Sequence, residues 1–394
     1  MNAIRLRLAR HPEAGAFIGL GVILLFFALA APSTFLSHNA FASILSNQAV
    51  PGIVAIGITL LMISGQFDLS VGSIMGVASL VFLYAAVQGL HILLAAALGL
   101  AAGCGLGLLN GLLLVWTGIP SFIITLGTML VYRAICLTTI SGGRIIRYAD
   151  FSRQDPQLTI PPLLVLTAAA ALLALVLWMA WGPIGRARGL RRAALLVSTL
   201  LAAVPLVSGL VVLHGRLFEP MAINFFHLLN GRFDWSLLPG NYRLSIVWWI
   251  ALSLLFGLIL NRTRFGNAVF ATGGNPLAAR SQGIAVNRVQ VINFVLSGGL
   301  AGSAGIIQVA RLKSVDPLRG TGLELEVIAA VVIGGSLLSG GYGSLAGSFA
   351  GTTLTGVLRT GLVLISVPAN AFRGAIGAIM IVAVIINSLV RRSK

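Results

Sequence analysis

The 394-residue chain has few charged side chains, at 9% of its residues, whereas a soluble domain carries roughly a quarter. Only nine residues are acidic, against 26 that are basic. Apolar runs long enough to cross a hydrocarbon core of about 30 Å recur from end to end. The composition therefore excludes an ordinary soluble domain and predicts an all-α, polytopic integral membrane protein.

Lysine is almost absent, and neither Lys313 nor Lys394 lies in the Gly-x4-Gly-Lys-Ser/Thr pattern that holds nucleotide phosphates. We therefore expect this chain to bind no ATP and to hydrolyse none. Cysteine is scarce too, and because Cys104 and Cys136 both lie in apolar runs, we expect them to be small buried side chains. The five histidines show no metal spacing. No nucleophile is paired with a base, so we expect neither a metal site nor an enzyme.

The excess of positive charge is better explained by membrane topology than by nucleic acid. Arginines collect on the cytoplasmic loops of membrane proteins, and here no aromatic residues interleave with them on a polar face. About 10–12 transmembrane helices are expected, some of them broken or re-entrant. The twelve predicted spans are 14–31, 46–64, 69–87, 91–115, 119–140, 160–181, 193–213, 244–260, 289–311, 325–340, 343–362 and 368–390.

An even number of spans puts both termini on one side of the membrane. Most arginine-rich segments fall on that same side: the N-terminal arm 1–13, loops 182–192 and 261–288, and the C-terminal tail. This side is therefore predicted to be cytoplasmic. The rest, 14–394, is expected to form a single transmembrane domain. A cleaved signal peptide is the alternative for the first apolar run, but no convincing cleavage site follows it.

Glycine is abundant at 47 residues and often clustered. In membrane helices it allows close approach of two backbones, and it also allows helices to break where protein can satisfy the freed backbone groups. Because "SGGYGS" joins spans 325–340 and 343–362, we expect a helical hairpin or a partly re-entrant pair there.

The loop 261–288 contains a short helix that is defined by its end residues. Asn275 is a good N-cap, Pro276 fits the first helical position, and Gly283 fits the position just past the C-terminus. A helix of about two turns is marginal by itself in water. It is therefore predicted to dock, either on its own protein or on a partner.

One carboxylate, Asp68, lies in "ISGQFDLSVGS" between two membrane-type runs. It is expected either to cap a helix that begins at Leu69, with help from Ser70, or to lie on a translocation path. Near other span ends, we expect Arg133, Arg359 and Arg373 to extend to the membrane interface. Glu324 and Glu326 are expected to stabilise the N-terminus of the tenth span.

"FGNAVFATGGNPLAARSQGIAVNRV" resembles the cytoplasmic coupling segment of the ribose and xylose permease family of bacterial sugar ABC importers. Gln282 and Asn267 depart from that pattern. Three more segments resemble family segments in the same order: "ISGQFDLSVGS", "GLLNGLLLVWTGIPSFIITLGTMLVYRA" and "GIIQVARLKSVDPLRGTGLELEVIAAVVIGGSLLSGGYGSLAG". The resemblance covers about 40–155 and 255–394, and the region near 160–240 looks like the two-span insertion of longer xylose-type members.

The resemblance implies a permease subunit in the bacterial inner membrane that translocates a monosaccharide, with a pentose such as xylose or ribose favoured. It further implies a permease homodimer, separate ABC ATPase subunits that bind ATP and Mg²⁺, a periplasmic sugar-binding protein, and no cofactor in this chain. The residues expected to contact the ATPase are Asn275, Pro276, Leu277, Ala278, Ala279, Arg280 and Gly283.

A neutral, hydroxyl-rich solute needs polar neutral groups along its path. The candidates, with Asp68 added, are Gln66, Asp68, Ser70, Ser73, Asn110, Ser121 and Thr125. The alternative function is an ion-coupled secondary transporter of a small polar solute, for which Asp68 is the candidate intramembrane carboxylate.

Overall fold

The computed structural model describes residues 13–140, 144–160, 221–233, 239–368, 374 and 377–378. The predicted N-terminal arm, spans 160–181, 193–213 and 368–390, and the expected insertion near 160–240 therefore lie wholly or largely outside the described residues. Arg373, which was expected to extend to the interface, lies outside them as well.

The chain divides into two compact units, one of Met1–Gln154 with Leu229–Lys394 and one of Asp155–Leu228. In the described part of the second unit, β2 (Gln157–Ile160) pairs antiparallel with β3 (Met221–Asn224), and α10 (Phe225–Asn230) follows. This pair of short strands was not predicted. The side-chain amide of Asn224 donates to the Asp155 carboxylate at 2.8 Å and fixes one end of it.

The described part of the first unit is helical, as the composition predicted. Its elements are α2 (Ala14–Ala30), α3 (Pro32–Phe35), α4 (His38–Ile63), α5 (Val71–Val87), α6 (Ile92–Thr117), α7 (Ser121–Thr139), β1 (Ile146–Arg147), η2 (Tyr148–Asp150), α11 (Leu244–Arg262), α12 (Arg264–Gly274), α13 (Pro276–Ser281), α14 (Val286–Leu312), β4 (Ser314–Val315), α15 (Leu323–Ile333) and α16 (Leu345–Leu364). The two-residue strands β1 and β4 pair antiparallel.

Five of the described helices are long and apolar enough to cross a membrane: α4, α6, α7, α11 and α14. Helix α5 and most of α2 are shorter apolar helices. The all-α, polytopic membrane fold predicted from the sequence is confirmed.

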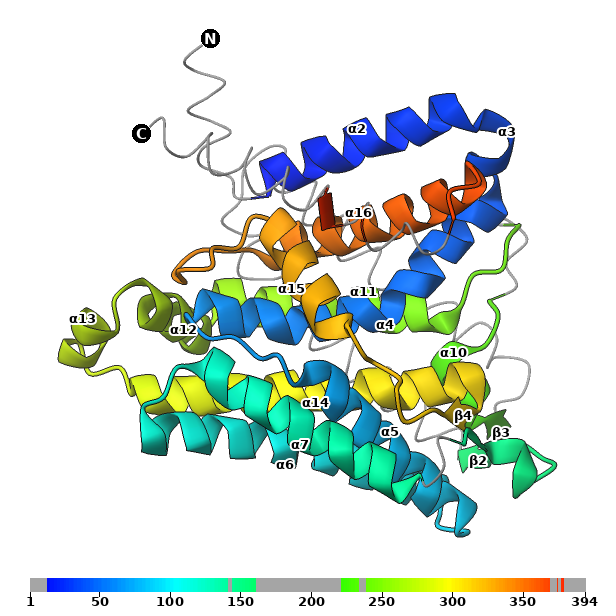
Figure 1. The fold of residues 1–394 in the computed structure, drawn as a ribbon, viewed down its shortest axis with the longest axis horizontal. Coiled ribbons are helices and arrows are strands. Elements are labelled where there is room, and N and C mark those ends of the chain that lie inside the picture. The colour runs from blue at the N-terminus through cyan, green and yellow to red at the C-terminus, as the bar shows by residue number, and fades with distance from the viewer. Residues whose placement is uncertain are drawn as a thin grey trace. The chain divides into compact units, whose positions relative to one another are not determined.

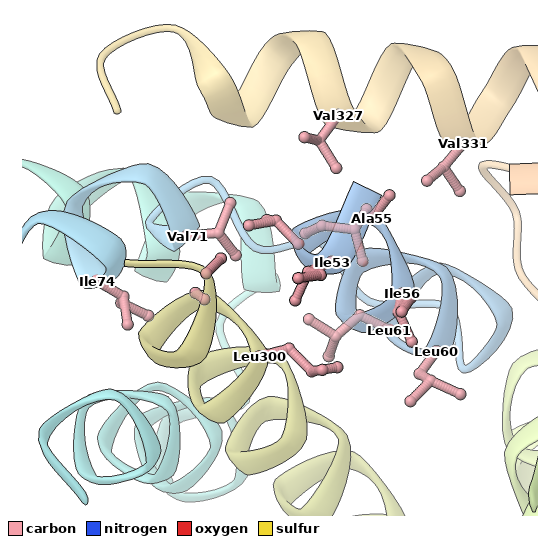
Figure 2. Packing of buried hydrophobic residues seen from close by; sticks show 14 of the residues in the cluster. Ile53, Ala55, Ile56, Leu60, Leu61, Val71, Ile74, Leu300, Val327 and Val331 are labelled. Atoms are coloured by element: carbon pink, nitrogen blue, oxygen red, sulfur yellow. The ribbon is translucent and has the colours of Figure 1, made fainter. Parts of the chain in front are cut away.

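Helix α4 is the centre of the bundle and is almost completely buried, with α14, α16, α11 and α15 packed around it. A helix that is apolar all round belongs in such a position. Figure 2 shows how side chains from four helices converge: Ile53 and Leu61 of α4, Val71 of α5, Leu300 of α14 and Val327 of α15.

Helices α6 and α14 pack with their backbones in direct contact. A methyl group on Gly107 would overlap the backbone carbonyl of Phe294, and one on Gly298 would overlap the carbonyl of Gly103. Without a hydrophobic driving force between helices in lipid, such close packing is a main source of association. The expectation of close helix approach at glycine clusters is confirmed here.

The first apolar run is part of the bundle. Phe27 of α2 is only 1% exposed and packs with Phe35, Ile44 and Leu354 in a second apolar cluster that α3, α4 and α16 complete. Whether the first span is retained or cleaved stays a prediction.

Two predicted boundaries were wrong for local reasons. Helix α4 begins at His38 rather than 46, because the Ser37 hydroxyl accepts from Ala40 N and caps it. Helix α15 ends at Ile333 rather than 340, because Gly335 turns the backbone into the left-handed region (φ +92°). Eleven residues rise about 16 Å, which is about half the thickness of a hydrocarbon core. The helical hairpin and the partly re-entrant pair both stay predictions for this region.

The α6–α14 contact predicts that Gly107→Ala destabilises the bundle by about 1–3 kcal/mol, because the added methyl overlaps the Phe294 carbonyl. The matched control is Gly105→Ala on the same helix, where a methyl group meets open space. Thermal unfolding of both purified variants in detergent measures the difference. Equal midpoints for the two variants would show that the backbones do not touch.

Candidate functional site

The segment between α4 and α5, residues 64–70, is the first candidate site. It is non-helical, and Asp68 within it is fully buried. Two of its backbone donors bond to the start of α7: Phe67 N donates to Ser121 Oγ at 3.0 Å, and Leu69 N donates to Thr125 Oγ1 at 3.1 Å. Irregular backbone inside a membrane bundle requires such partners, because lipid supplies none.

A chain of side-chain hydrogen bonds extends from Asp68 to α7. The hydroxyl of Ser70 donates to Asp68 Oδ1 at 2.6 Å, and Asn110 Nδ2 of α6 donates to Ser70 Oγ at 2.8 Å. The hydroxyl of Tyr132 then donates to Asn110 Oδ1 at 2.9 Å. Because all four side chains are almost fully buried, these bonds fix how the 64–70 segment lies against α6 and α7.

The structure therefore brings together five of the seven candidate path residues: Asp68, Ser70, Asn110, Ser121 and Thr125. The other two lie on the same stretch of chain without joining the network. Gln66 is half-buried, and Ser73 in the first turn of α5 has a buried hydroxyl with no partner among the described residues. Whether any of them lines a path stays a prediction.

Tyr132 is a member of this network that the sequence analysis missed. It follows Thr125 by seven residues, or two helical turns, so it shares a face of α7 with Ser121 and Thr125. That spacing was a readable signal, since an amphipathic stripe of Ser, Thr and Tyr on an otherwise apolar helix indicates a polar partner.

The expected helix cap at Asp68 was wrong in its details. The helix begins at Val71 with Ser70 as its N-cap residue, and Asp68 Oδ1 accepts from the backbone N–H of Ser70 at 2.8 Å. This i to i+2 bond makes a turn that precedes the helix rather than a cap on it. Asp68 Oδ2 has no hydrogen-bond partner among the described residues.

The α12–α13 segment is the second candidate site, and it forms as its end residues predicted. Thr263 Oγ1 accepts from Gly266 N at 3.2 Å and caps α12. Asn275 Oδ1 accepts from Ala278 N at 3.0 Å and caps α13, with Pro276 at the first position. Gly283 lies just past the end of α13 with φ +82°.

Helix α13 is anchored on one face and open on the other. Ala279 is buried, and Arg280 donates to Asn287 Oδ1 at 2.9 Å, which ties the helix to the start of α14. On the outer face Leu277 is 77% exposed. Figure 1 shows α12 and α13 at one end of the first unit, with the β1–β4 pair toward its other end. The segment therefore exposes the apolar side chain of Leu277 on a short helix that is held against the start of α14.

Two arginines that were expected to extend to the interface bind groups of the protein, and their reach to the interface stays a prediction. Arg133 of α7 donates to the Leu318 carbonyl at 3.3 Å and to the Thr321 hydroxyl. Arg359 of α16 forms an ion pair with Glu326 of α15 at 2.7 Å. In a membrane bundle a paired charge costs far less than an unpaired one, and the Arg359–Glu326 pair meets this condition.

The two acidic residues at the start of α15 differ in their roles. Glu324 Oε1 accepts from the backbone N–H of Gly322, the N-cap residue, at 3.1 Å, so its expected stabilisation of the helix start is confirmed. Glu326 is instead the partner of Arg359. The described residues contain no group of three or more His, Cys, Asp or Glu that could hold a metal ion.

Comparison with known proteins agrees with this arrangement. The profile of a protein family described as "Branched-chain amino acid transport system / permease component" matches residues 40–384. The xylose transport system permease protein XylH of Escherichia coli (strain K12) is 33% identical over 97% of this chain and 96% of its own. XylH of Haemophilus influenzae is 31% identical over 94% of each chain.

The ribose import permease protein RbsC of Escherichia coli (strain K12) is 29% identical over 95% of this chain and 94% of its own. No solved structure matches the chain. The relatives are thus transport permeases that the chain matches over almost its whole length.

The Asp68 network predicts different outcomes for two substitutions. Asp68→Asn keeps Oδ1 as the acceptor for both Ser70 donors, whereas Asp68→Ala leaves these buried donors unpaired, at a cost of about 1–3 kcal/mol for each. Thermal unfolding in detergent should therefore be near wild type for the first and clearly lowered for the second. The control Asp150→Ala removes an exposed carboxylate and should change little. An Asp68→Ala midpoint equal to that of wild type would contradict the network.

Proposed function

Because the chain belongs to the permease-component family of branched-chain amino acid transport systems, we propose that it is the membrane-spanning subunit of an ATP-driven ABC importer that moves a pentose. The observation that carries the proposal is the similarity to xylose permeases over 97% of the chain. The chain is a multi-pass membrane protein, and the proposal places it in the bacterial inner membrane with both termini in the cytoplasm.

The driving force in this scheme comes from a separate ATPase subunit, which binds ATP and Mg²⁺. The sequence has no phosphate-binding loop, so a partner must hydrolyse the nucleotide. The α12–α13 segment supports such a contact, because its helix is capped at both ends, rests on α14 and exposes Leu277. A helix that places apolar side chains in a groove of its partner is a recurring mode of protein recognition.

A second partner, a periplasmic sugar-binding protein, delivers the solute at the opposite side of the membrane, and two copies of this chain enclose the path. The proposal keeps the 64–70 segment and its neighbours as the polar part of that path. In the described conformation their hydrogen bonds are made to one another, so passage requires the 64–70 segment to exchange these bonds for bonds to solute hydroxyls. No catalytic step is assigned to this chain.

The ATPase contact predicts that Leu277→Asp lowers co-purification of the ATPase subunit about tenfold, since placing a charge at an apolar anchor costs more than about 1.4 kcal/mol. The control Leu277→Met keeps an apolar side chain of similar volume and should retain the ATPase. Affinity pull-down of tagged chain from membranes that contain both proteins measures the ratio. Equal recovery of the ATPase with both variants would remove α13 from the interface.

The substrate is tested by uptake of labelled solutes in cells that lack other pentose importers. We expect uptake of xylose or ribose that depends on this chain and that stops when the ATPase is inactivated by substitution of its phosphate-binding lysine. Leucine is the necessary comparison, because the family description names branched-chain amino acids. Leucine uptake without pentose uptake, or pentose uptake that persists without ATP hydrolysis, would overturn the proposal.

A further inference from the structure

Three backbone segments that are distant in the sequence meet beside α13. Gly341 N, in the connection between α15 and α16, donates to the carbonyl oxygen of Ile63 in the last turn of α4 at 2.8 Å. A methyl group on Gly273 of α12 would overlap that carbonyl and lie 2.6 Å from Gly341 N, and one on Gly340 would lie 2.8 Å from the Cα of Gly65. We call these five residues the glycine junction.

Four of the five residues of the glycine junction are glycines, and the contacts between its three segments are made by backbone atoms. Packed side chains adjust to displacement by changing rotamers, but here backbone lies directly on backbone. Three of its glycines, Gly65, Gly340 and Gly341, also have φ of +79°, +80° and +74°, where other residues are strained. A displacement of Gly273 must therefore move the Ile63 carbonyl and Gly341 or break the hydrogen bond between them.

The glycine junction lies between the two candidate sites. Gly273 precedes Asn275, the N-cap of α13, by two residues, and Gly65 precedes Asp68 by three. Beyond Gly65, the 64–70 segment is bonded to α7 through Ser121 and to α6 through Asn110. A continuous series of backbone contacts and buried hydrogen bonds thus connects the exposed helix α13 with α4, α6 and α7.

We propose that Gly273 is a positioning residue for transport, which transmits a displacement of α13 through the Ile63 carbonyl to the 64–70 segment. This inference rests on the proposed function, in which an ATPase subunit displaces α13. Because the contact is backbone to backbone, it requires glycine at 273 in particular, and it does not depend on the identity of the transported solute.

The test compares two neighbouring substitutions in the reconstituted complex of chain, ATPase and binding protein. Gly273→Ala places a methyl group on the Ile63 carbonyl, whereas Gly274→Ala places one 3.9 Å from the Cα of Gly341, at ordinary van der Waals distance. We expect Gly273→Ala to bind the ATPase and hydrolyse ATP but to transport roughly tenfold less solute per ATP, within the usual range of coupling between sites. Gly274→Ala should match wild type.

A second variant tests the same link without overpacking, because Gly273→Ala could prevent folding. Insertion of two glycines between Gly274 and Asn275 leaves the glycine junction intact but lets α13 move independently of it. The same insertion after Gly89, where the chain turns in open space between α5 and α6, is the control. We expect solute transported per ATP to fall for the first insertion and to stay at the wild-type value for the second.

The readouts separate failure of this inference from failure of the proposed function. A wild-type chain that transports without an ATPase contradicts the proposed function itself. The role of the glycine junction alone is overturned by a different pair of results. The wild type transports in an ATP-dependent way, and either the α12–α13 insertion or a folded Gly273→Ala variant transports the wild-type amount of solute per ATP. A merely structural role would lower the amount of assembled complex but leave the ratio of solute to ATP unchanged.

Discussion

The constraint on which the structure depends is the need of the 64–70 segment for hydrogen-bond partners inside an apolar bundle. Continuous helices meet this need by themselves, but here two helices are interrupted, and backbone donors at Phe67 and Leu69 lose their helical partners. Hydroxyls of α7 replace those partners, and Asp68, Ser70 and Asn110 bond to one another. The interruption is thus fixed in place by α6 and α7 rather than left to lipid or water.

Because the 64–70 segment is bonded to neighbouring helices, a displacement of another part of the bundle can move it. The helix α13, which is capped, supported by α14 and exposed at Leu277, is positioned to receive such a displacement, and the glycine junction lies between it and the interrupted helices. No phosphate-binding loop occurs in the sequence. These features agree with the proposed role of a permease subunit that is moved by a partner.

Local features of the fold could be predicted from the sequence, and long-range contacts could not. The short helix after Asn275 was predicted because its cap residues are adjacent to it. The long apolar runs predicted most boundaries of the described spans to within a few residues. The start of α4 was missed because residues 38–45 are only partly apolar, and its cap at Ser37 outweighs that weak periodicity. The hydrogen-bond chain through Tyr132 joins residues on different helices, and so does the glycine junction. A glycine pattern in the sequence indicates that a second backbone comes close, but it does not identify which segment that is.

The most direct test of this account is solute accumulation by the purified chain alone in lipid vesicles, with a proton or sodium gradient imposed across the membrane. The account predicts no xylose or ribose inside above the external concentration until the ATPase, the binding protein and ATP are supplied. Concentrative uptake by the chain alone would contradict the account, because it would show that the energy source lies within this polypeptide.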